Sequence, residues 1–288
     1  HISLWFGAND IVLGVEHHPH ASVVYAIAPD ATVAADVLEW FKKHEHTYRK
    51  IDKTIAKLCV VGVDSRGCAE LADGPTVKSK FIPTNYPADV QTSFKAVVKA
   101  LKKPKGDGRR LVLIDGPPGT GKSWLARALI TALPGATHVL IPPGAVAASF
   151  APTNVTFWLE TVAEANSRVI LYVEDADVLV NKQARTDYAA GLGVVLGLGD
   201  GLAASILDVT LVLLTNTETQ QIDPAILRPG RLLARIYVPD FTADAEARER
   251  GLRVLARLRK IPLNSAVPML GEAPKTLAEA YERAARKI

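Results

Sequence analysis

Hydrophobic and polar positions divide the chain into two parts with different periodicity. In the first part, apolar runs at 12–15, 22–27 and 58–63 are typical of strands. Between them, apolar residues at helical spacing, with basic residues on the opposite face, predict a helix over about 32–57. We therefore expect an N-terminal α+β domain over 1–84, a candidate for recognition of a substrate or partner.

After this part, strand and helix patterns alternate. Turn residues and prolines at 72–87 mark the change in periodicity, and they predict a main domain over 85–241 and a short helical C-terminal lid over 242–288. The expected strands lie at 110–115, 137–141, 168–174, 208–214 and 234–238, and the expected helices at 88–102, 122–133, 153–166 and 187–198. Alternating β and α units favour an α/β fold in which helices sandwich a parallel sheet.

Composition excludes several classes of protein. Hydrophobic residues make up 48% and charged residues 22%, which excludes a disordered chain or a collagen-like fibre. The net charge of +4 is small and spread along the chain, so nucleic acid is not the first expectation for a partner. Two cysteines without a CxxC motif favour a reducing, cytoplasmic location. No apolar run reaches about 18 residues, so no transmembrane segment is expected.

A glycine-rich motif follows the apolar strand at 111–115. Residues Gly116-Pro-Pro-Gly-Thr-Gly-Lys-Ser123 match G-x-x-x-x-G-K-[ST], a loop whose backbone N–H groups surround phosphates. Lys122 would reach the β and γ phosphates, and the Ser123 hydroxyl would ligate Mg²⁺. The alternative is a glycine-rich turn that binds no ligand. The candidate nucleotide-binding residues are Gly116, Pro117, Pro118, Gly119, Thr120, Gly121, Lys122, Ser123 and Trp124.

Two acidic residues follow the apolar run at 169–173. Glu174 and Asp175 end this expected buried strand, and acids at the carboxyl end of a parallel strand would face the phosphate crevice. They are therefore candidates for holding the metal and for orienting the attacking water. The alternative is a strand that simply ends in solvated carboxylates.

Two later segments resemble signatures of a known family. Leu211-Val-Leu-Leu-Thr-Asn216 and Ile222-Asp-Pro-Ala-Ile-Leu-Arg-Pro-Gly-Arg231 resemble consecutive motifs of the AAA+ ATPases, in the AAA clade, over about 85–241. The turn at 199–201 also resembles the Asp-Gly turn of that clade. The resemblance implies a Walker A motif at 116–123 and further catalytic candidates, namely Glu174 and Asp175 (Walker B), Asn216 (sensor 1), and Arg228 and Arg231 (arginine fingers acting on a neighbouring subunit).

The resemblance also implies a function. We expect Mg²⁺-dependent ATP hydrolysis in a homo-oligomeric ring, with six subunits as the expected number, coupled to remodelling or threading of a protein substrate. ATP, ADP and Mg²⁺ are the implied ligands. Two alternatives stay open: a nucleic-acid-associated motor built on the same ATPase, and an ATP-responsive switch with little turnover.

Physical reasoning supports these roles but leaves alternatives. A guanidinium stabilises charge that develops on the γ-phosphate, and Arg228 and Arg231 flank a Pro-Gly turn suited to an exposed corner. They could also be solvated turn residues, and Asn216 could merely cap the next turn. The order of Glu174 and Asp175 departs from the usual Asp-Glu. By register, Glu174 takes the metal side and Asp175 polarises the water. Because the Asp175 side chain is shorter than glutamate by one methylene, slower hydrolysis than usual stays open.

Other segments give weaker signals. Phe150-Ala151-Pro152 partly matches the aromatic loop that grips substrate in a central pore, and an ordinary packed aromatic is the alternative for Phe150. Arg283 or Arg286 in the lid could act as a sensor-2 arginine, against a solvated helix. The histidines between His17 and His46 are expected at the surface rather than as metal ligands, and the basic run at 99–110 as a solvated face.

Overall fold

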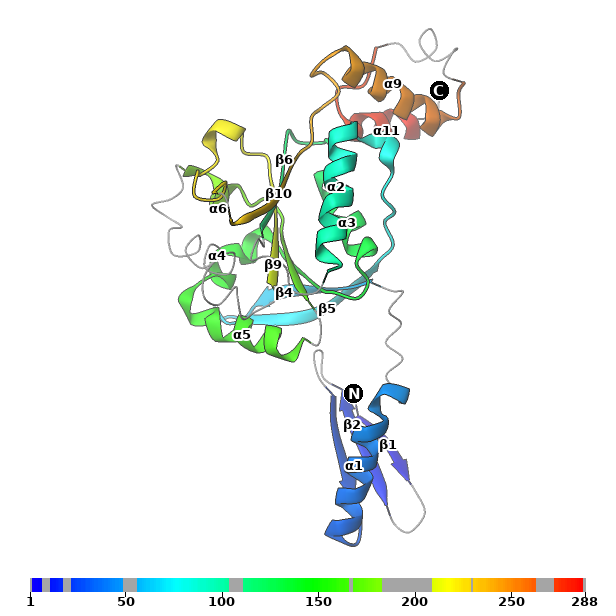
Figure 1. Cartoon of the computed structure of the whole chain (residues 1–288), viewed down its shortest axis with the longest axis vertical. Coiled ribbons are helices and arrows are strands. Elements are labelled where there is room, and N and C mark those ends of the chain that lie inside the picture. Colours follow the sequence, from blue (N-terminus) through cyan, green and yellow to red (C-terminus); the bar gives the residue numbers. More distant parts are fainter. Residues whose placement is uncertain are drawn as a thin grey trace.

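The computed structural model contains two β-sheets with helices packed on them (Figure 1). It describes residues 2–6, 11–17, 22–48, 56–103, 111–165, 168–182, 209–228, 230–262 and 272–286. The expected helix at 187–198 and the turn at 199–201 lie outside these residues. No helix in the described ranges is both long and apolar enough to span a bilayer.

The smaller sheet is formed by the N-terminal segment. Strands β1 (Ile2–Phe6), β2 (Val12–His17) and β3 (Ser22–Ile27) pair antiparallel in the order β1-β2-β3. Helix α1 (Ala31–Tyr48) packs against β3. The strand and helix patterns of this segment are thus confirmed, although the expected helix at 32–57 ran too far, because a strand begins at residue 56.

The larger sheet has seven strands in the order β10-β6-β9-β8-β7-β4-β5. All neighbours pair parallel except β4 and β5, which are antiparallel. The strands are β4 (Ala56–Val63), β5 (Ala69–Val77), β6 (Leu111–Asp115), β7 (Thr137–Ile141), β8 (Val169–Val173), β9 (Val209–Thr215) and β10 (Leu232–Tyr237). The five strands expected after residue 85 are therefore confirmed, within a mainly parallel α/β sheet.

The expected domain boundary at residue 84 does not agree with this sheet. Strand β4 pairs with β7 through Leu58 and His138, and β5 extends the same sheet, so two strands of the main sheet precede the boundary. Leu58 and Val61 are buried in the main cores. A local pattern reveals that a strand forms but not which strand it pairs with, since the partner is set by packing with residues far along the chain.

Helices cover both faces of the main sheet and create two cores. Helices α2 (Ala88–Leu101) and α3 (Lys122–Ala132) lie on the face that includes Val112 and Ile114 of β6. Helices α4 (Val146–Ser149), α5 (Val155–Glu164) and α6 (Asp177–Val180) lie on the opposite face, which includes Leu111 and Leu113. All five residues of β6 are buried, so the strand that leads into the glycine-rich motif is rigidly held.

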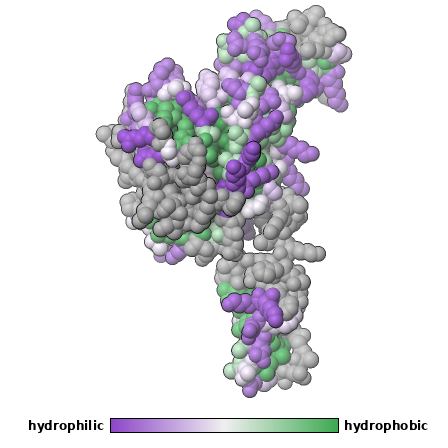
Figure 2. Space-filling view, in the orientation of Figure 1, coloured by the Kyte–Doolittle hydropathy of each residue, from purple (hydrophilic) through white to green (hydrophobic). Residues whose placement is uncertain are grey.

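Two helices lie in the described part of the C-terminal segment, which was expected to form a lid. Helix α9 (Ala245–Arg259) begins at Asp244, whose carboxylate accepts a hydrogen bond from Ala247 N at 2.7 Å. Helix α11 (Leu277–Ala285) begins at Thr276, whose hydroxyl accepts from Glu279 N at 3.2 Å. The two helices pack on each other, and α9 contacts the short turn at Pro83–Asn85 before α2. Figure 2 shows that their visible face is mostly hydrophilic.

Candidate functional site

The glycine-rich loop at 116–123, called the phosphate loop below, needs glycine at positions 116 and 121. Gly116 has φ 144° and Gly121 has φ 96°, in the region that side chains rarely adopt. A Cβ atom at Gly116 would lie 2.2 Å from the Val238 carbonyl oxygen, and one at Gly121 would lie 2.5 Å from Leu277 Cδ2. Only glycine lets the loop turn this tightly against β10 and the lid.

Lys122 is buried and held by three oxygen atoms. Its Nζ atom donates hydrogen bonds to Gly116 O, Pro117 O and Asn216 Oδ1, each at 2.7 Å. Burial lowers the pKa of Lys122, and nearby carboxylates, led by Asp177, oppose that shift. The amine is thus fixed between the phosphate loop and the end of β9.

The two predicted acids lie in the same cavity as Lys122 and Ser123. Glu174 follows the last residue of β8 and is half-buried, while Asp175 is exposed. Asp175 adopts φ 48°, a left-handed conformation that is uncommon for a residue with a side chain. Such outliers persist where surrounding structure enforces them, often at functional sites. Which acid faces a metal stays a prediction.

A third acid in this region was missed as a site residue from the sequence. Asp177 Oδ1 accepts hydrogen bonds from Thr215 Oγ1 at 2.9 Å, Asn216 N at 3.1 Å and Thr217 Oγ1 at 2.8 Å. It therefore clamps the start of α6 to the residues on both sides of Asn216. In the sequence, only the threonines that flank Asn216 point to such an acid. They do so only when β8 and β9 are known to be neighbouring strands, which brings Asp177 close to them.

The cavity has a volume of about 460 Å³, which is in the range of small-molecule sites. Six of the nine predicted nucleotide-binding residues line it: Pro118, Gly119, Gly121, Lys122, Ser123 and Trp124. Asn216 and both acids at the end of β8 also line it. The other three, Gly116, Pro117 and Thr120, support the loop, in which Thr120 Oγ1 donates to Pro117 O at 2.9 Å.

The lid and the segment before α2 close the cavity on another side. Ala278 N donates to Gly119 O at 2.9 Å, which joins the start of α11 to the phosphate loop. Asn85 is 3% exposed and donates to the Tyr281 hydroxyl at 3.3 Å, while Arg257 donates to Asn85 Oδ1 at 2.6 Å. No local pattern revealed Asn85 or Tyr281, because they are far apart in the sequence.

The two predicted arginine fingers lie outside the cavity of their own chain. Arg228 is exposed. Arg231 is half-buried, and its Nη1 atom donates to Ala225 O at 2.9 Å, so its guanidinium braces its own turn. Within one chain the structure therefore does not bring either arginine to Lys122.

The remaining candidate residues from the sequence lie away from the cavity. Phe150 is 0% exposed and stacks on Trp158 with ring centroids 6.2 Å apart, so of the two interpretations the structure agrees with the packed aromatic and not with the substrate-gripping one. The apolar positions around it form a core instead. Arg283 donates to Glu272 O and Arg286 pairs with Glu282, and neither lines the cavity. The described residues contain no group of three or more His, Cys, Asp or Glu side chains placed to hold a metal ion.

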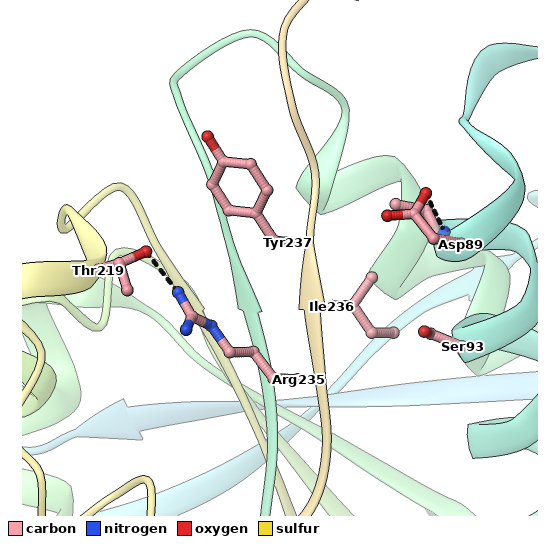
Figure 3. A pocket seen from close by; sticks show the side chains of 7 residues that line it. Asp89, Ser93, Thr219, Arg235, Ile236 and Tyr237 are labelled. Carbon is pink, nitrogen blue, oxygen red and sulfur yellow. Dashed lines mark hydrogen bonds between the residues drawn. The ribbon is translucent and has the colours of Figure 1, made fainter. Parts of the chain in front are cut away.

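A second hollow of about 350 Å³ lies along β10 (Figure 3). Arg235 lines it and forms an ion pair with the buried Asp115, with Nε 3.0 Å from Oδ1 and Nη2 2.5 Å from Oδ2. The hydrogen bond that Arg235 donates to Asp115 raises the pKa of Arg235. Arg235 Nη2 also donates to Thr219 Oγ1 at 2.5 Å. Neither member of the pair was singled out from the sequence.

Comparisons with known proteins find similar sequences. Residues 112–240 match the model of the ATPase family associated with various cellular activities (AAA). The peroxisomal ATPase PEX6 of Arabidopsis thaliana is 32% identical over 173 residues, which is 57% of this chain and 18% of the relative. The 26S proteasome subunit RPT4 of Saccharomyces cerevisiae is 29% identical over 147 residues, covering 48% of this chain and 32% of the relative.

A third relative matches a longer part of the chain. The ATP-dependent zinc metalloprotease FtsH of Lactococcus lactis is 29% identical over 228 residues, covering 72% of this chain and 31% of the relative. The chain thus spans less than a third of each of these relatives. Residues 112–240, which match the family model, include the phosphate loop, both acids of the cavity, Asn216 and both predicted finger arginines. The chain therefore carries an ATPase domain of the AAA family, from residue 112 to residue 240.

Proposed function

We propose that this protein binds ATP with Mg²⁺ in the cavity at the phosphate loop and hydrolyses it in a ring of identical subunits. One observation carries the proposal. The Lys122 amine is fixed between the phosphate loop and Asn216, in a cavity that also contains Ser123 and two carboxylates. These are the groups that bind and cleave a triphosphate in nucleotide hydrolases.

The residues present fit the proposed ligands. Glycines at 116 and 121 let the loop turn tightly where Cβ atoms would collide with Val238 and Leu277, and the N–H groups of such a loop are the donors that a phosphate would accept from. The Ser123 hydroxyl and the carboxylates of Glu174 and Asp175 offer oxygen ligands of the kind that Mg²⁺ requires. When bound, Mg²⁺ would neutralise charge on the phosphate oxygens.

Each side chain then has a separate task. Lys122 would exchange its three protein acceptors for phosphate oxygens, since its amine is a compact cation with three donors. Asn216 would orient the attacking water through its side-chain amide. Of the acids, we assign Glu174 to the metal side and Asp175 to the acceptance of a proton from that water.

The position of Arg228 supports a ring. This arginine is exposed and does not line the cavity of its own chain, so it would act only on the nucleotide of a neighbouring copy. Arg231 would need to release Ala225 O to do the same. We propose a closed ring, with six as the expected number of subunits, in which each cavity is completed by its neighbour.

The substrate that we propose is a protein. Two of the matched relatives, a proteasome subunit and an ATP-dependent metalloprotease, have names that point to protein substrates. The N-terminal unit, β1 to β3 with α1, is the candidate for substrate or partner recognition. Since Phe150 is buried, we assign no pore contact to it.

The test is phosphate release by the purified protein, with and without an unfolded protein or DNA. Lys122→Ala should abolish nucleotide binding and turnover, whereas Lys95→Ala, which removes an exposed lysine of α2, should retain both. Turnover that survives in Lys122→Ala would contradict the assignment of the cavity. Stimulation by DNA alone would favour a nucleic-acid motor, and an assembled ring without turnover would favour a switch.

A further inference from the structure

Two basic side chains bridge the same two segments of the chain. Inside the cavity, Lys122 links the phosphate loop to Asn216 through Gly116 O and Asn216 Oδ1. On the other side of β6, Arg235 links Asp115, the residue before the loop, to Thr219, three residues after Asn216. We call residues 216–221 the sensor segment.

The Arg235 bridge depends on the sheet register. Arg235 lies opposite Leu113 of β6, so its side chain reaches forward to Asp115, the last residue of that strand. Figure 3 shows Arg235 extended toward Thr219, away from Ile236. The Nη2 atom donates to both Asp115 Oδ2 and Thr219 Oγ1 at 2.5 Å. One guanidinium nitrogen thus connects the root of the phosphate loop to the sensor segment.

The ion pair between Arg235 and Asp115 holds both side chains in fixed positions. Asp115 is 1% exposed, so its carboxylate has little access to water and depends on Arg235. The planar guanidinium holds the carboxylate through Nε and Nη2 together, which fixes its direction as well as its position. A lysine at this position would be a single point of charge and could not fix both partners in the same way.

The two bridges differ in what nucleotide would do to them. Under the proposed function, Lys122 must leave Gly116 O and Asn216 Oδ1 when it contacts phosphate, so the inner bridge is broken on binding. None of the three residues of the outer bridge, Arg235, Asp115 and Thr219, lines the cavity, so bound nucleotide would leave their hydrogen bonds in place. We propose that Arg235 is a positioning residue, which holds the sensor segment in register with the phosphate loop when Lys122 has turned to the nucleotide.

The cleanest variant is Thr219→Val. Loss of Arg235 or Asp115 would leave a buried or half-buried charge without its partner, and such variants often fail to fold. Thr219 is exposed, and its removal leaves the ion pair intact while it cuts the link to the sensor segment. Thr219→Ser restores the hydroxyl, and Thr92→Val, an exposed threonine of α2, is the matched control.

Kinetics provide the first test. Because a hydrogen bond from a charged donor is lost, Thr219→Val should lower kcat for ATP about tenfold with KM unchanged. Thr219→Ser and Thr92→Val should match the wild type. The proposal would be overturned by a change in KM alone, or by a fall in kcat that is equal in Thr219→Val and Thr219→Ser.

Amide hydrogen exchange provides the second test and does not depend on turnover. With a non-hydrolysable ATP analogue and Mg²⁺, exchange in the sensor segment should be about tenfold faster in Thr219→Val than in the wild type. Without nucleotide, exchange in the sensor segment should be equally fast in the two proteins, because Lys122 still links this segment to the phosphate loop. A difference that is the same with and without the analogue would show a purely structural effect and overturn the proposal.

The same data separate this inference from the proposed function on which it rests. Protection of the phosphate loop by the analogue in the wild type supports nucleotide binding. If that protection is present but the sensor segment behaves alike in Thr219→Val and wild type, the bridge proposal alone fails. If the analogue protects nothing in the wild type, both proposals fail.

Discussion

The ammonium nitrogen of Lys122 lies 2.7 Å from Oδ1 of Asn216, a residue 94 positions further along the chain. The backbone N–H of Asn216 is held in turn by Asp177 Oδ1 at 3.1 Å. Three loops at the carboxyl ends of β6, β8 and β9 are thus joined through a single asparagine. Under the proposed function, Asn216 is therefore the residue that would sense the state of the cavity.

Removal of the Asn216 amide should therefore affect the reaction more than binding. In Asn216→Ala, Lys122 keeps its two loop carbonyl partners and can still reach phosphate, so ATP affinity should stay within a few fold of the wild type. Hydrolysis should fall by about 10², because a donor that positions the reacting groups is lost. Fluorescent nucleotide binding and phosphate release measure the two effects. Gln220→Ala, an exposed residue nearby, should change neither.

The acid pair gives a prediction that tests the register argument. Asp175→Asn should bind ATP and stall, because the group that accepts the proton from water is neutralised. Glu174→Gln should chiefly raise the Mg²⁺ concentration needed for half-maximal activity, because a metal ligand loses its charge. A Mg²⁺ titration of both variants is the measurement. Reversed phenotypes would place Asp175 on the metal side instead.

The two arginines should differ in what their loss does to the fold. Arg228→Ala should keep the wild-type melting temperature and lose about 10³-fold or more in turnover if the side chain acts on a neighbour. Arg231→Ala also removes the hydrogen bond to Ala225 O, so it should be less stable by about 1 kcal/mol. Thermal melts and phosphate release measure the two properties.

Mixing of subunits tests whether the arginines act between chains. Lys122→Ala subunits cannot turn over ATP but still present Arg228, so addition to Arg228→Ala subunits should restore part of the activity at mixed interfaces. Activity that does not depend on protein concentration, with no rescue on mixing, would show that each chain acts alone and would contradict the ring.

The sequence revealed those parts of the fold that depend on local chemistry. The phosphate loop, its strand and its helix were predicted because glycine at 116 and 121, a buried run at 111–115 and a helix starting at Lys122 are all neighbours in the chain. The acids after β8 followed from the same reasoning, since polar residues at the end of an apolar strand stand out without knowledge of the sheet.

Features that depend on distant contacts were not predicted. Arg235 and Asp115 are separated by 120 positions, and Asn85 and Tyr281 by 196, so no periodicity links them. Likewise, the segment that begins at Phe150 partly matches a motif for an exposed loop, yet the Phe150 ring is buried against Trp158. Pairing and burial of this kind are decided by how elements pack, which a local pattern does not contain.

One buried histidine in the main sheet should make stability depend on pH. His138 is 0% exposed and lies between the Tyr172 hydroxyl, 3.0 Å from Nδ1, and Leu133 O, 2.9 Å from Nε2. Since a carbonyl oxygen only accepts, Nε2 carries the proton and Nδ1 accepts from Tyr172. Both ring nitrogens are thus satisfied in the neutral form, and burial lowers the pKa of His138 to about 4.

The sign of this pH dependence follows from the difference in the pKa of His138 between the folded and the unfolded chain. Above pH 6.5 the imidazole is neutral in both states and contributes no pH dependence. As the pH falls from about 6.5 to about 4, the unfolded chain binds a proton that the folded chain does not, so His138 should lower the free energy of unfolding by about 3 kcal/mol. Urea melts across this range measure it. His138→Gln, whose amide can donate to Leu133 O and accept from Tyr172, should be less stable than the wild type at pH 7 but show a flatter slope between pH 6.5 and 4. Equal slopes in the two proteins would mean that His138 takes up its proton without unfolding.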